Sequence, residues 1–475
     1  MGCRSSAAGL VAIVLAAGCS TTLKPGDREA AFAVAVEVGQ SRRPEAAARA
    51  TWAYLSGATE DDPRYDRAVR LMARAAESMG FSYAASLWYL EIAQARRDVT
   101  LLPEAVRGLE RIILGGPHDE EVLINGFLGS AELSELPPDI QAFVDFHQGV
   151  ASIRNDLDHW ASDRFSRIPE SSIYFARMKY VRAVELVKKG KLKEAAEAFE
   201  AILELDALDE ALKADVHRSL ARLHFENGKY DDALEHYQII REMAPGDPEL
   251  LLEMAWAHYY EGDSRRALGL LYALDAPVYA DLIAPERFLL EALCLRRLCQ
   301  FGPARNAAIR LAQRHGDAVG DIYSGVPLGQ SKVLQAAAAE RGLTRKIALY
   351  RKRLEEEKGR IALVQGTIGA GLANELHKIY DAGIAEAKRR EAEMMALEVD
   401  ELADALLQAE EGVRLILHEL GVALLRGRRP PEGATEATAV EIPTGGDQVF
   451  YRFEGEFWTD ELDDFVVYAE DRCID

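Results

Sequence analysis

The sequence predicts a mainly α-helical fold. Repeated helical hairpins form an α-solenoid, and a long antiparallel helical hairpin and a small C-terminal β-hairpin follow it. Three observations support this fold class. Glycines recur in the middle of the chain at intervals of 38 and 34 residues. Apolar residues alternate at spacings of four and three after residue 331, and near the C-terminus they alternate with polar ones.

The N-terminal segment MGCRSSAAGLVAIVLAAGCSTT joins a short basic start, a small apolar run and a cysteine. This order is typical of a secretory signal, and the run is too short to span a bilayer as a mature helix. The stretch LAAGC resembles the lipobox of bacterial lipoproteins. The resemblance implies that residues 1–18 are removed, that Cys19 carries the acyl chains such as palmitate, and that residues 19–28 form a tether. Ser20 implies sorting to the outer membrane, with the protein facing the periplasm.

A competing interpretation concerns the first residues of the same segment. Met1-Gly2-Cys3 followed by Ser6 fits the eukaryotic myristoylation pattern, with Cys3 as a palmitoylation site. That pattern explains neither the apolar run nor the LAAGC stretch, so the lipoprotein interpretation is favoured.

The composition is acidic, with 78 Asp and Glu against 56 Lys and Arg in 475 residues, a formal net charge of −22. Such a surface repels nucleic acid and anionic lipid, so neither is expected as a partner. Besides Cys19, only three cysteines follow the signal. Cys294 and Cys299 lie five residues apart in one predicted helix and point to different sides, and Cys473 lies at the end of the chain. A disulfide framework is therefore not expected.

A four-fold register defines the repeats. One position is held by Gly190, Gly228, Gly262 and Cys299, and alanines lie seven residues before it and five after it. A large apolar residue lies nine after it in three cases: Phe199, Tyr237 and Leu271, with Ala308 in the fourth. Small residues allow two helices to approach closely, and the glycine lies where the chain turns. The register therefore predicts four helical hairpins.

This register resembles the tetratricopeptide repeat and covers residues 174–322. A weaker match upstream includes Gly80, Ala85, Tyr89, Ala161 and Phe165. Residues 29–173 are therefore expected to form degenerate hairpins of the same kind, separated by turns at 115–117 and 137–138. The alternative is an unrelated all-helical domain. Stacked hairpins bury one continuous core and leave a long concave face.

The resemblance implies that this concave face binds an extended peptide or another protein. Mapping the inward positions of the first helix of each repeat gives the expected partner-binding residues: Arg177, Tyr180, Arg218, Arg222, Phe225, Trp256, Tyr259, Tyr260 and Arg296. Arginine and aromatic residues are the usual anchors of protein interfaces. The alternative is that the aromatic residues pack between repeats and that the arginines pair with neighbouring glutamates.

Residues 331–425 predict two long helices with coiled-coil spacing. The second run, from Met395 to Leu420, keeps its four-three rhythm unbroken, whereas Glu357 occupies one apolar position of the first. The segment GTIGAG, residues 366–371, separates the runs. It favours an antiparallel hairpin that turns there, and the alternative is that the seam pairs with a second molecule or a partner.

The last fifty residues change character. Residues 426–447 predict a linker rich in Pro, Gly, Thr and Ala. Residues 448–475 predict a β-hairpin tail with strands at about 448–454 and 464–470. The tail resembles that of tetratricopeptide proteins of myxobacteria, some of which belong to the machinery of gliding motility. The residues that carry this resemblance are Phe453, Gly455, Glu456, Phe457, Trp458, Asp460, Glu461, Leu462 and Cys473.

No catalytic motif occurs: HExxH, GxSxG, CxxC and a Walker loop are all absent from the sequence. No catalytic residue, metal site or cofactor is expected, and His217 and His224, seven apart on one helix face, are assigned to packing. The sequence therefore predicts a lipid-anchored scaffold that binds other cell-envelope proteins, within an envelope or motility machine. The first alternative is a chaperone or assembly factor for outer-membrane or secreted proteins. The second is a cryptic enzyme that uses acids of the tail, such as Glu456 and Asp460.

Overall fold

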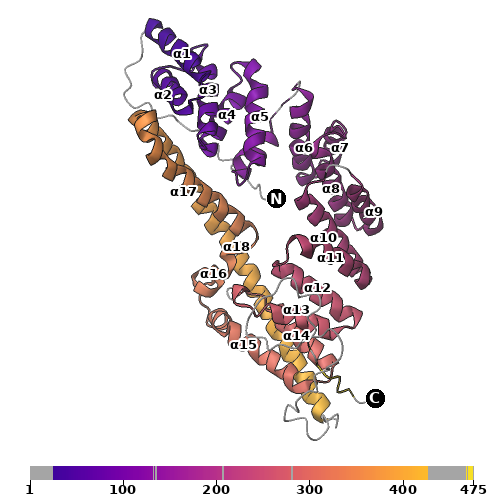
Figure 1. Ribbon diagram of the computed structural model, residues 1–475. Helices are drawn as coiled ribbons and strands as arrows, with labels where there is room; N and C mark the ends of the chain where they lie inside the picture. Colours follow the sequence, from indigo (N-terminus) through magenta and orange to yellow (C-terminus); the bar gives the residue numbers. More distant parts are fainter. Residues whose placement is uncertain are drawn as a thin grey trace, which may run out of the picture. The chain divides into compact units, whose positions relative to one another are not determined.

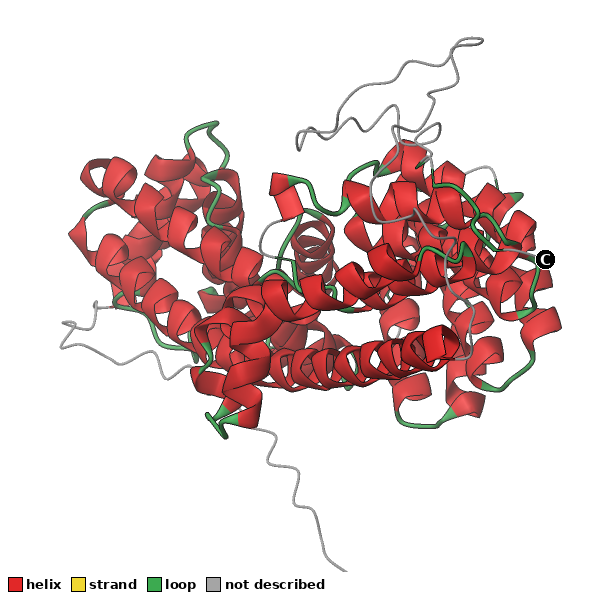
Figure 2. Ribbon diagram, turned by 90° about the horizontal axis from the view of Figure 1, so that it is seen from below, coloured by secondary structure: helices red, strands yellow, loops and turns green. Residues whose placement is uncertain are grey.

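The computed structural model describes residues 25–131, 133, 136–205, 208–279, 282–425, 467 and 469–473. The signal peptide and Cys19 lie outside the described residues. Every regular element in the described part is a helix (Figure 1, Figure 2). None of the helices that could be searched combines the length and the apolar character needed to cross a membrane. The chain divides into two compact units: the first comprises residues 1–140 and 350–386, and the second comprises residues 141–349 and 387–475.

The first unit begins with antiparallel helices that pack in sequence. Its helices are α1 (Pro25–Gly39), α2 (Pro44–Leu55), α3 (Tyr65–Ser78), α4 (Ser82–Ala95), η1 (Val99–Leu101), α5 (Leu102–Leu114) and the π-helix η2 (Glu121–Leu128). Helix α1 packs on α2, α3 on α4, and α4 on α5. Consecutive hairpins of this kind are the architecture expected of a helical solenoid.

The second unit contains the predicted repeats. Its helices are α6 (Pro138–Arg154), which begins in the first unit, α7 (Asp158–Phe165), α8 (Ile173–Lys188), α9 (Leu192–Leu203), α10 (Glu210–Glu226), α11 (Tyr230–Met243), α12 (Pro248–Glu261), α13 (Ser264–Ala273), η3 (Pro277–Tyr279), α14 (Glu286–Arg297), α15 (Phe301–Tyr323), η4 (Leu328–Gln330) and α16 (Lys332–Ala339). The hairpins α8–α9, α10–α11, α12–α13 and α14–α15 are the four repeats. We call the side formed by α8, α10, α12 and α14 the inner face.

The predicted register lies where the hairpins turn and touch. Gly190, Gly228 and Gly262 follow the first helix of their hairpins with φ angles of 72°, 74° and 110°. This left-handed conformation costs a residue with a side chain about 1–2 kcal/mol, so glycine is favoured there. The register alanines are fully buried: Ala183, Ala195, Ala221, Ala233, Ala255, Ala267, Ala292 and Ala304. Small side chains thus set the close approach within each hairpin.

The same register occurs upstream. Gly80 turns between α3 and α4 with φ of 79°, and Asp156 turns between α6 and α7 with φ of 57°. Across the second of these hairpins, Gly149 lies against the ring of Phe165, which is nearly fully buried. A Cβ at position 149 would lie 2.2 Å from that ring, so the glycine makes room for the aromatic residue. Helices α6 and α7 therefore form a hairpin built on the same packing rule.

Two long helices, α17 (Gly342–Ile368) and α18 (Ala370–Leu425), contribute residues to both units. They are separated by Gly369, whose φ of 87° breaks the helix inside the GTIGAG segment. Within the first unit Lys358 of α17 contacts Asp381 of α18 at 2.5 Å. Within the second unit Arg341, just before α17, lies 3.9 Å from Glu398. The pairing of earlier with later positions makes the two helices antiparallel.

The four-three seam of α18 packs against the repeats of the same chain. Val399, Leu402 and Leu406 share a buried cluster with residues of α15 and α16. Further along, Ile416 and Leu420 join the core of the repeats α10 to α15. The sequence left open whether this apolar stripe pairs within the chain or with a second molecule. In the structure it is buried within the chain.

The predicted C-terminal β-hairpin is wrong. Its first strand, 448–454, lies outside the described residues, and the described part of the second, Val467 and 469–470, has no strand structure (Figure 2). These residues bond instead to helix ends of the repeats. The backbone N–H of Val467 donates to the Arg265 carbonyl at 3.3 Å, and the Arg265 guanidinium donates to the Ala469 carbonyl at 2.8 Å. These hydrogen bonds to the helices satisfy backbone N–H and C=O groups of the tail without a second strand.

The structure also contains a disulfide that the sequence analysis did not predict. Cys299, at the glycine position of the fourth repeat, bonds to Cys473, 174 residues later, while Cys294 is buried as a free thiol. Cys299 has a φ of 54°, the left-handed conformation that glycine supplies in the other repeats. The spacing argument considered only partners within one helix. It missed the bond because the second cysteine comes from the docked tail.

Candidate partner-binding face

The arginines predicted for the inner face form ion pairs between neighbouring repeats. Arg177 of α8 donates to Asp209 at 3.1 Å, and Arg222 of α10 donates to Glu253 of α12 at 2.5 Å. Arg218 pairs with Asp247. The partners are 29 to 32 residues apart, which is about one repeat. The alternative interpretation, in which these arginines pair with neighbouring acids, therefore describes their contacts in the structure.

Two of the acids serve the helices as well as the arginines. Asp209 precedes α10 and accepts the backbone N–H of Leu212, and Asp247 precedes α12 and accepts the N–H of Glu249. Burial alone would raise the pKa of Asp209. The Leu212 N–H and the Arg177 guanidinium outweigh that effect and hold the pKa below its ordinary value. Each N-cap thus links the start of one inner helix to the helix before it.

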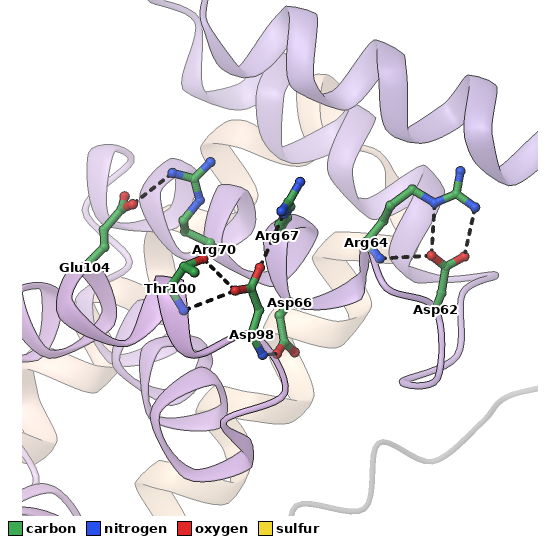
Figure 3. Close-up of polar contacts among 8 residues, drawn as sticks. All are labelled: Asp62, Arg64, Asp66, Arg67, Arg70, Asp98, Thr100 and Glu104. Atoms are coloured by element: carbon green, nitrogen blue, oxygen red, sulfur yellow. Dashed lines mark hydrogen bonds and ion pairs between the residues drawn. The ribbon is translucent and has the colours of Figure 1, made fainter. Parts of the chain in front are cut away.

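The first unit contains ion pairs with a similar spacing in the sequence (Figure 3). Arg67 and Arg70 of α3 reach Asp98 at 3.4 Å and Glu104 at 2.8 Å, 31 and 34 residues away. Asp98 is the N-cap of η1, and its own N–H donates to Asp66 at 3.1 Å. Exposed pairs of this kind contribute little stability one by one. Their regular spacing fixes the register of one hairpin on the next.

Five rings from α10, α11 and α12 form a continuous cluster that we call the aromatic ridge. Its members are Phe225, Tyr230, Trp256, Tyr259 and Tyr260. Tyr260 stacks on Tyr230 with ring centroids 5.5 Å apart and on Trp256 at 5.8 Å. Phe225 meets both Tyr230 and Tyr260 edge-on. Tyr260 is still 48% exposed, so the ridge presents a ring edge to solvent.

Two polar features border the ridge. The guanidinium of Arg297 lies 4.0 Å from the centroid of the Tyr259 ring and donates to the Tyr259 carbonyl. The indole Nε1 of Trp256 is buried and has no hydrogen-bond partner among the described residues. An unpaired buried donor costs about 1–3 kcal/mol relative to a bonded one, so this group gains from an added acceptor.

The inner face is not open along its whole length, because α18 covers the fourth repeat. Leu289 of α14 lies against Gly412 of α18, where a Cβ would come within 3.0 Å of the leucine. Arg296 of α14 pairs with Glu419 of α18. The fourth inner helix is therefore occupied by the protein's own helix.

The structure brings together some of the predicted site residues and separates others. Phe225, Trp256, Tyr259 and Tyr260 meet in the aromatic ridge. Tyr180 contacts the Ser219 hydroxyl at 3.3 Å and packs on a buried cluster of the first two repeats, and Arg296 lies under α18. Sequence reasoning missed Tyr230, because it searched only the first helix of each hairpin and Tyr230 begins the second. The signal was present, since Tyr230 follows the turn glycine Gly228 by two residues.

Buried ionisable groups also occur in the packing between the helices of the repeats. Burial raises the pKa of Glu291 to about 7, although Arg310 pairs with it. The rings of His217 and His236 contact each other with Nδ1 atoms 3.0 Å apart, and burial lowers the pKa of both. No group of three or more His, Cys, Asp or Glu in the described part of the chain is arranged to hold a metal ion.

One comparison with known proteins agrees with the hairpin register. The family model described as tetratricopeptide repeat matches residues 180–248. No curated protein matches the chain. A tetratricopeptide repeat protein from Parabacteroides merdae is 11% identical with a TM-score of 0.25, over 60% of this chain and 93% of that one. The TPR domain of P58(IPK) is 15% identical with a TM-score of 0.20, over 76% of this chain and 98% of that one.

The family match carries the assignment, and the loose superpositions add nothing to it. Its range begins within α8 and ends at the start of α12, so it covers most of the first two repeats, including their turns at Gly190 and Gly228. Residues 180–248 therefore match the tetratricopeptide repeat, a module that generally binds other proteins and is not catalytic.

Proposed function

We propose that this protein is a scaffold that holds partner proteins on the inner face of its second unit, anchored by a lipid on Cys19 to the periplasmic side of the outer membrane. The observation that carries the proposal is the contrast along the inner face. α18 covers α14, whereas the aromatic ridge between α10 and α12 presents Tyr260 to solvent. Aromatic residues beside paired arginines are the usual composition of interface centres.

The Cys299–Cys473 bond supports the proposed location. Disulfides persist in oxidising compartments such as the periplasm and are rare in the reducing cytosol. An exported chain is also what the apolar N-terminal run and the LAAGC stretch predict. The proposed link to an envelope or motility machine depends on tail residues 453–462, which lie outside the described residues. Identifying the partner proteins would test this link.

A fixed partner is favoured over many transient clients. The inner-face arginines are held by carboxylates, and the ridge rings hold one another, so little side-chain ordering is needed on binding. Promiscuous binders instead use flexible, methionine-rich surfaces that repack. The chaperone hypothesis predicts many weakly held proteins in a pull-down, and the scaffold hypothesis predicts few.

The anchor is tested by fractionating cells that express wild type or Cys19→Ala. Wild type is expected in the outer membrane, and the variant is expected in the soluble periplasmic fraction or retained as a precursor. A matched Cys294→Ala variant, which leaves the signal unchanged, should behave as wild type. Outer-membrane retention of Cys19→Ala would contradict the lipid anchor.

The partner face is tested by crosslinked pull-downs from membranes. Wild type is compared with a chain carrying Arg222→Ala, Trp256→Ala and Tyr260→Ala. The control is Trp160→Ala, which removes an exposed tryptophan of α7 (59% exposed) away from the ridge. A small set of envelope proteins lost only from the triple variant supports the proposal. Recovery of the same proteins by all three chains would show that the inner face is not the binding face.

A further inference from the structure

We propose that the aromatic ridge binds a proline-rich, positively charged segment in the polyproline II conformation. The inference rests on the proposed function, because it names the partner chemistry of the same face. It goes further by predicting which peptide sequences the ridge accepts and which it rejects.

The rings of the ridge hold one another in place. Tyr260 lies between Tyr230 and Trp256 in one stack, and Phe225 and Tyr259 brace it edge-on at 5.6 Å and 5.4 Å. Rings held on several sides keep their orientation before a ligand arrives. Proline rings fit the shallow spaces between such aromatic edges, and a polyproline II segment has little conformational entropy left to lose.

The ridge also contains an unused hydrogen-bond donor. Trp256 Nε1 has no partner in the described part of the chain. A polyproline II segment has no internal hydrogen bonds, so its carbonyl oxygens remain free to accept. Proline itself lacks an N–H, and a donor on the ridge therefore complements such a segment better than an acceptor would. The indole N–H paired with a peptide carbonyl satisfies both groups.

The charge around the ridge sets the sign of the partner. From Phe225 to Asp263 the chain carries ten carboxylates and two basic residues. The nearby Arg222 is engaged by Glu253, and Arg297 is engaged by the Tyr259 ring and carbonyl. The excess negative charge attracts Lys or Arg in the partner and repels acidic segments.

The experiment measures binding of three labelled twelve-residue peptides to the full chain by fluorescence anisotropy at low salt. The first repeats Pro-Pro-Arg, the second repeats Pro-Pro-Glu, and the third repeats Ala-Ala-Arg and so keeps the charge without proline. The first is expected to bind, with the other two at least about tenfold weaker. Tyr260→Ala should weaken binding of the first by about tenfold, and Trp256→Phe, which keeps a ring but removes the N–H, by about threefold.

Two controls keep the outcomes interpretable. Tyr260→Phe keeps the stack and should bind the first peptide within about twofold of wild type, and Trp160→Ala should be unchanged. Three outcomes would each overturn the inference. The first peptide fails to bind, the Ala-Ala-Arg peptide binds equally well, or Tyr260→Ala binds the first peptide as tightly as wild type does. If the ridge variant loses its envelope partners in pull-downs while no proline-rich peptide binds, the scaffold function stands and this partner chemistry is wrong.

Discussion

Glu357 of α17 accepts a hydrogen bond of 2.5 Å from the hydroxyl of Tyr380 of α18, across the long helical hairpin of the first unit. The same carboxylate accepts the backbone N–H of Tyr83 at 3.0 Å and the Nε–H of Arg353 at 3.2 Å. Tyr83 lies in the first turn of α4, where free N–H groups favour an anion. Glu357 is only 2% exposed, so one buried carboxylate ties the hairpin to a repeat.

This relationship predicts that Glu357→Leu destabilises the first unit although leucine would complete the apolar seam. The substitution removes the acceptor of the Tyr380 hydroxyl, the Tyr83 N–H and the Arg353 Nε–H. The Arg353 guanidinium keeps its bond to the Pro117 carbonyl. The expected loss is about 3–5 kcal/mol, and Tyr380→Phe, which removes one donor, should cost about 1–3 kcal/mol. Urea denaturation followed by circular dichroism measures both.

The matched control for this test is Leu363→Ala on the same helix. Leu363 is 83% exposed, so its change should stay within about 0.5 kcal/mol of wild type. A Glu357→Leu protein as stable as wild type would show that apolar packing, not the carboxylate, holds the hairpin on the repeat.

His315 predicts a loss of stability in mild acid. Its ring lies on α15 against Phe288, and burial, aided by Arg314 and Arg287, lowers its pKa from 6.5 to about 4. The unfolded chain therefore binds a proton that the folded chain does not between these values. The destabilisation that His315 causes is absent above pH 6.5. It grows as the pH falls and reaches about 2 kcal/mol at pH 5.

The test compares wild type with His315→Gln at pH 7.5 and pH 5. Glutamine carries no charge at either pH, so the fall in unfolding free energy should be smaller for the variant by about 2 kcal/mol. Burial raises the pKa of Glu291 to about 7, so that group acts in the opposite direction: the folded chain gains stability as pH falls through 7. Equal pH dependence of both proteins would contradict the role of His315.

The repeat register could be found in the sequence because it follows from local chemistry. A turn that needs a positive φ selects glycine, as at Gly190 and Gly228, and a close helix crossing selects alanine, as at Ala195 and Ala233. Each requirement recurs at one repeat's spacing, so periodicity reveals it. The same register placed Phe225, Trp256, Tyr259 and Tyr260 on the first helices of the repeats, but it did not predict that they form one cluster with Tyr230 of a second helix.

The contacts that join distant segments could not be found this way. Nothing near Glu357 in the sequence indicates Tyr83, 274 residues away, or that a carboxylate replaces an apolar seam residue to cap α4. Likewise the tail was expected to pair strand to strand, whereas Val467 and Ala469 bond to Arg265 of α13. Such pairings depend on which surfaces meet after folding, which a single sequence does not encode locally.

The disulfide predicts a ranking of three variants. Cys473→Ser and Cys299→Ser both lose the bond, and both keep a residue with a Cβ at position 299, in the left-handed conformation with φ of 54°. Cys299→Gly loses the bond and relieves that cost, so it should be about 1 kcal/mol more stable than Cys299→Ser. All three should be less stable than the oxidised wild type by up to several kcal/mol, because the bond closes a loop of 174 residues.

The ranking is measured by urea denaturation with and without reductant, and bond formation is checked by thiol labelling and mass spectrometry. Reductant should lower the stability of wild type to near that of Cys473→Ser and leave the three variants unchanged. Labelling of Cys299 and Cys473 in the untreated wild type would contradict the bond. A Cys299→Gly protein less stable than Cys299→Ser would contradict the assignment of position 299 to the glycine register.

The turn glycines predict opposite effects of one substitution at two kinds of position. Gly190 has φ of 72° and open space around it, so Gly190→Ala meets no clash and should cost about 1–2 kcal/mol from backbone conformation alone. Gly359 also has open space but lies inside the helix α17 with ordinary φ, so Gly359→Ala should stabilise by up to about 1 kcal/mol. Thermal or urea denaturation of the two variants gives the comparison. Two changes of the same sign would show that the left-handed conformation at residue 190 does not select glycine.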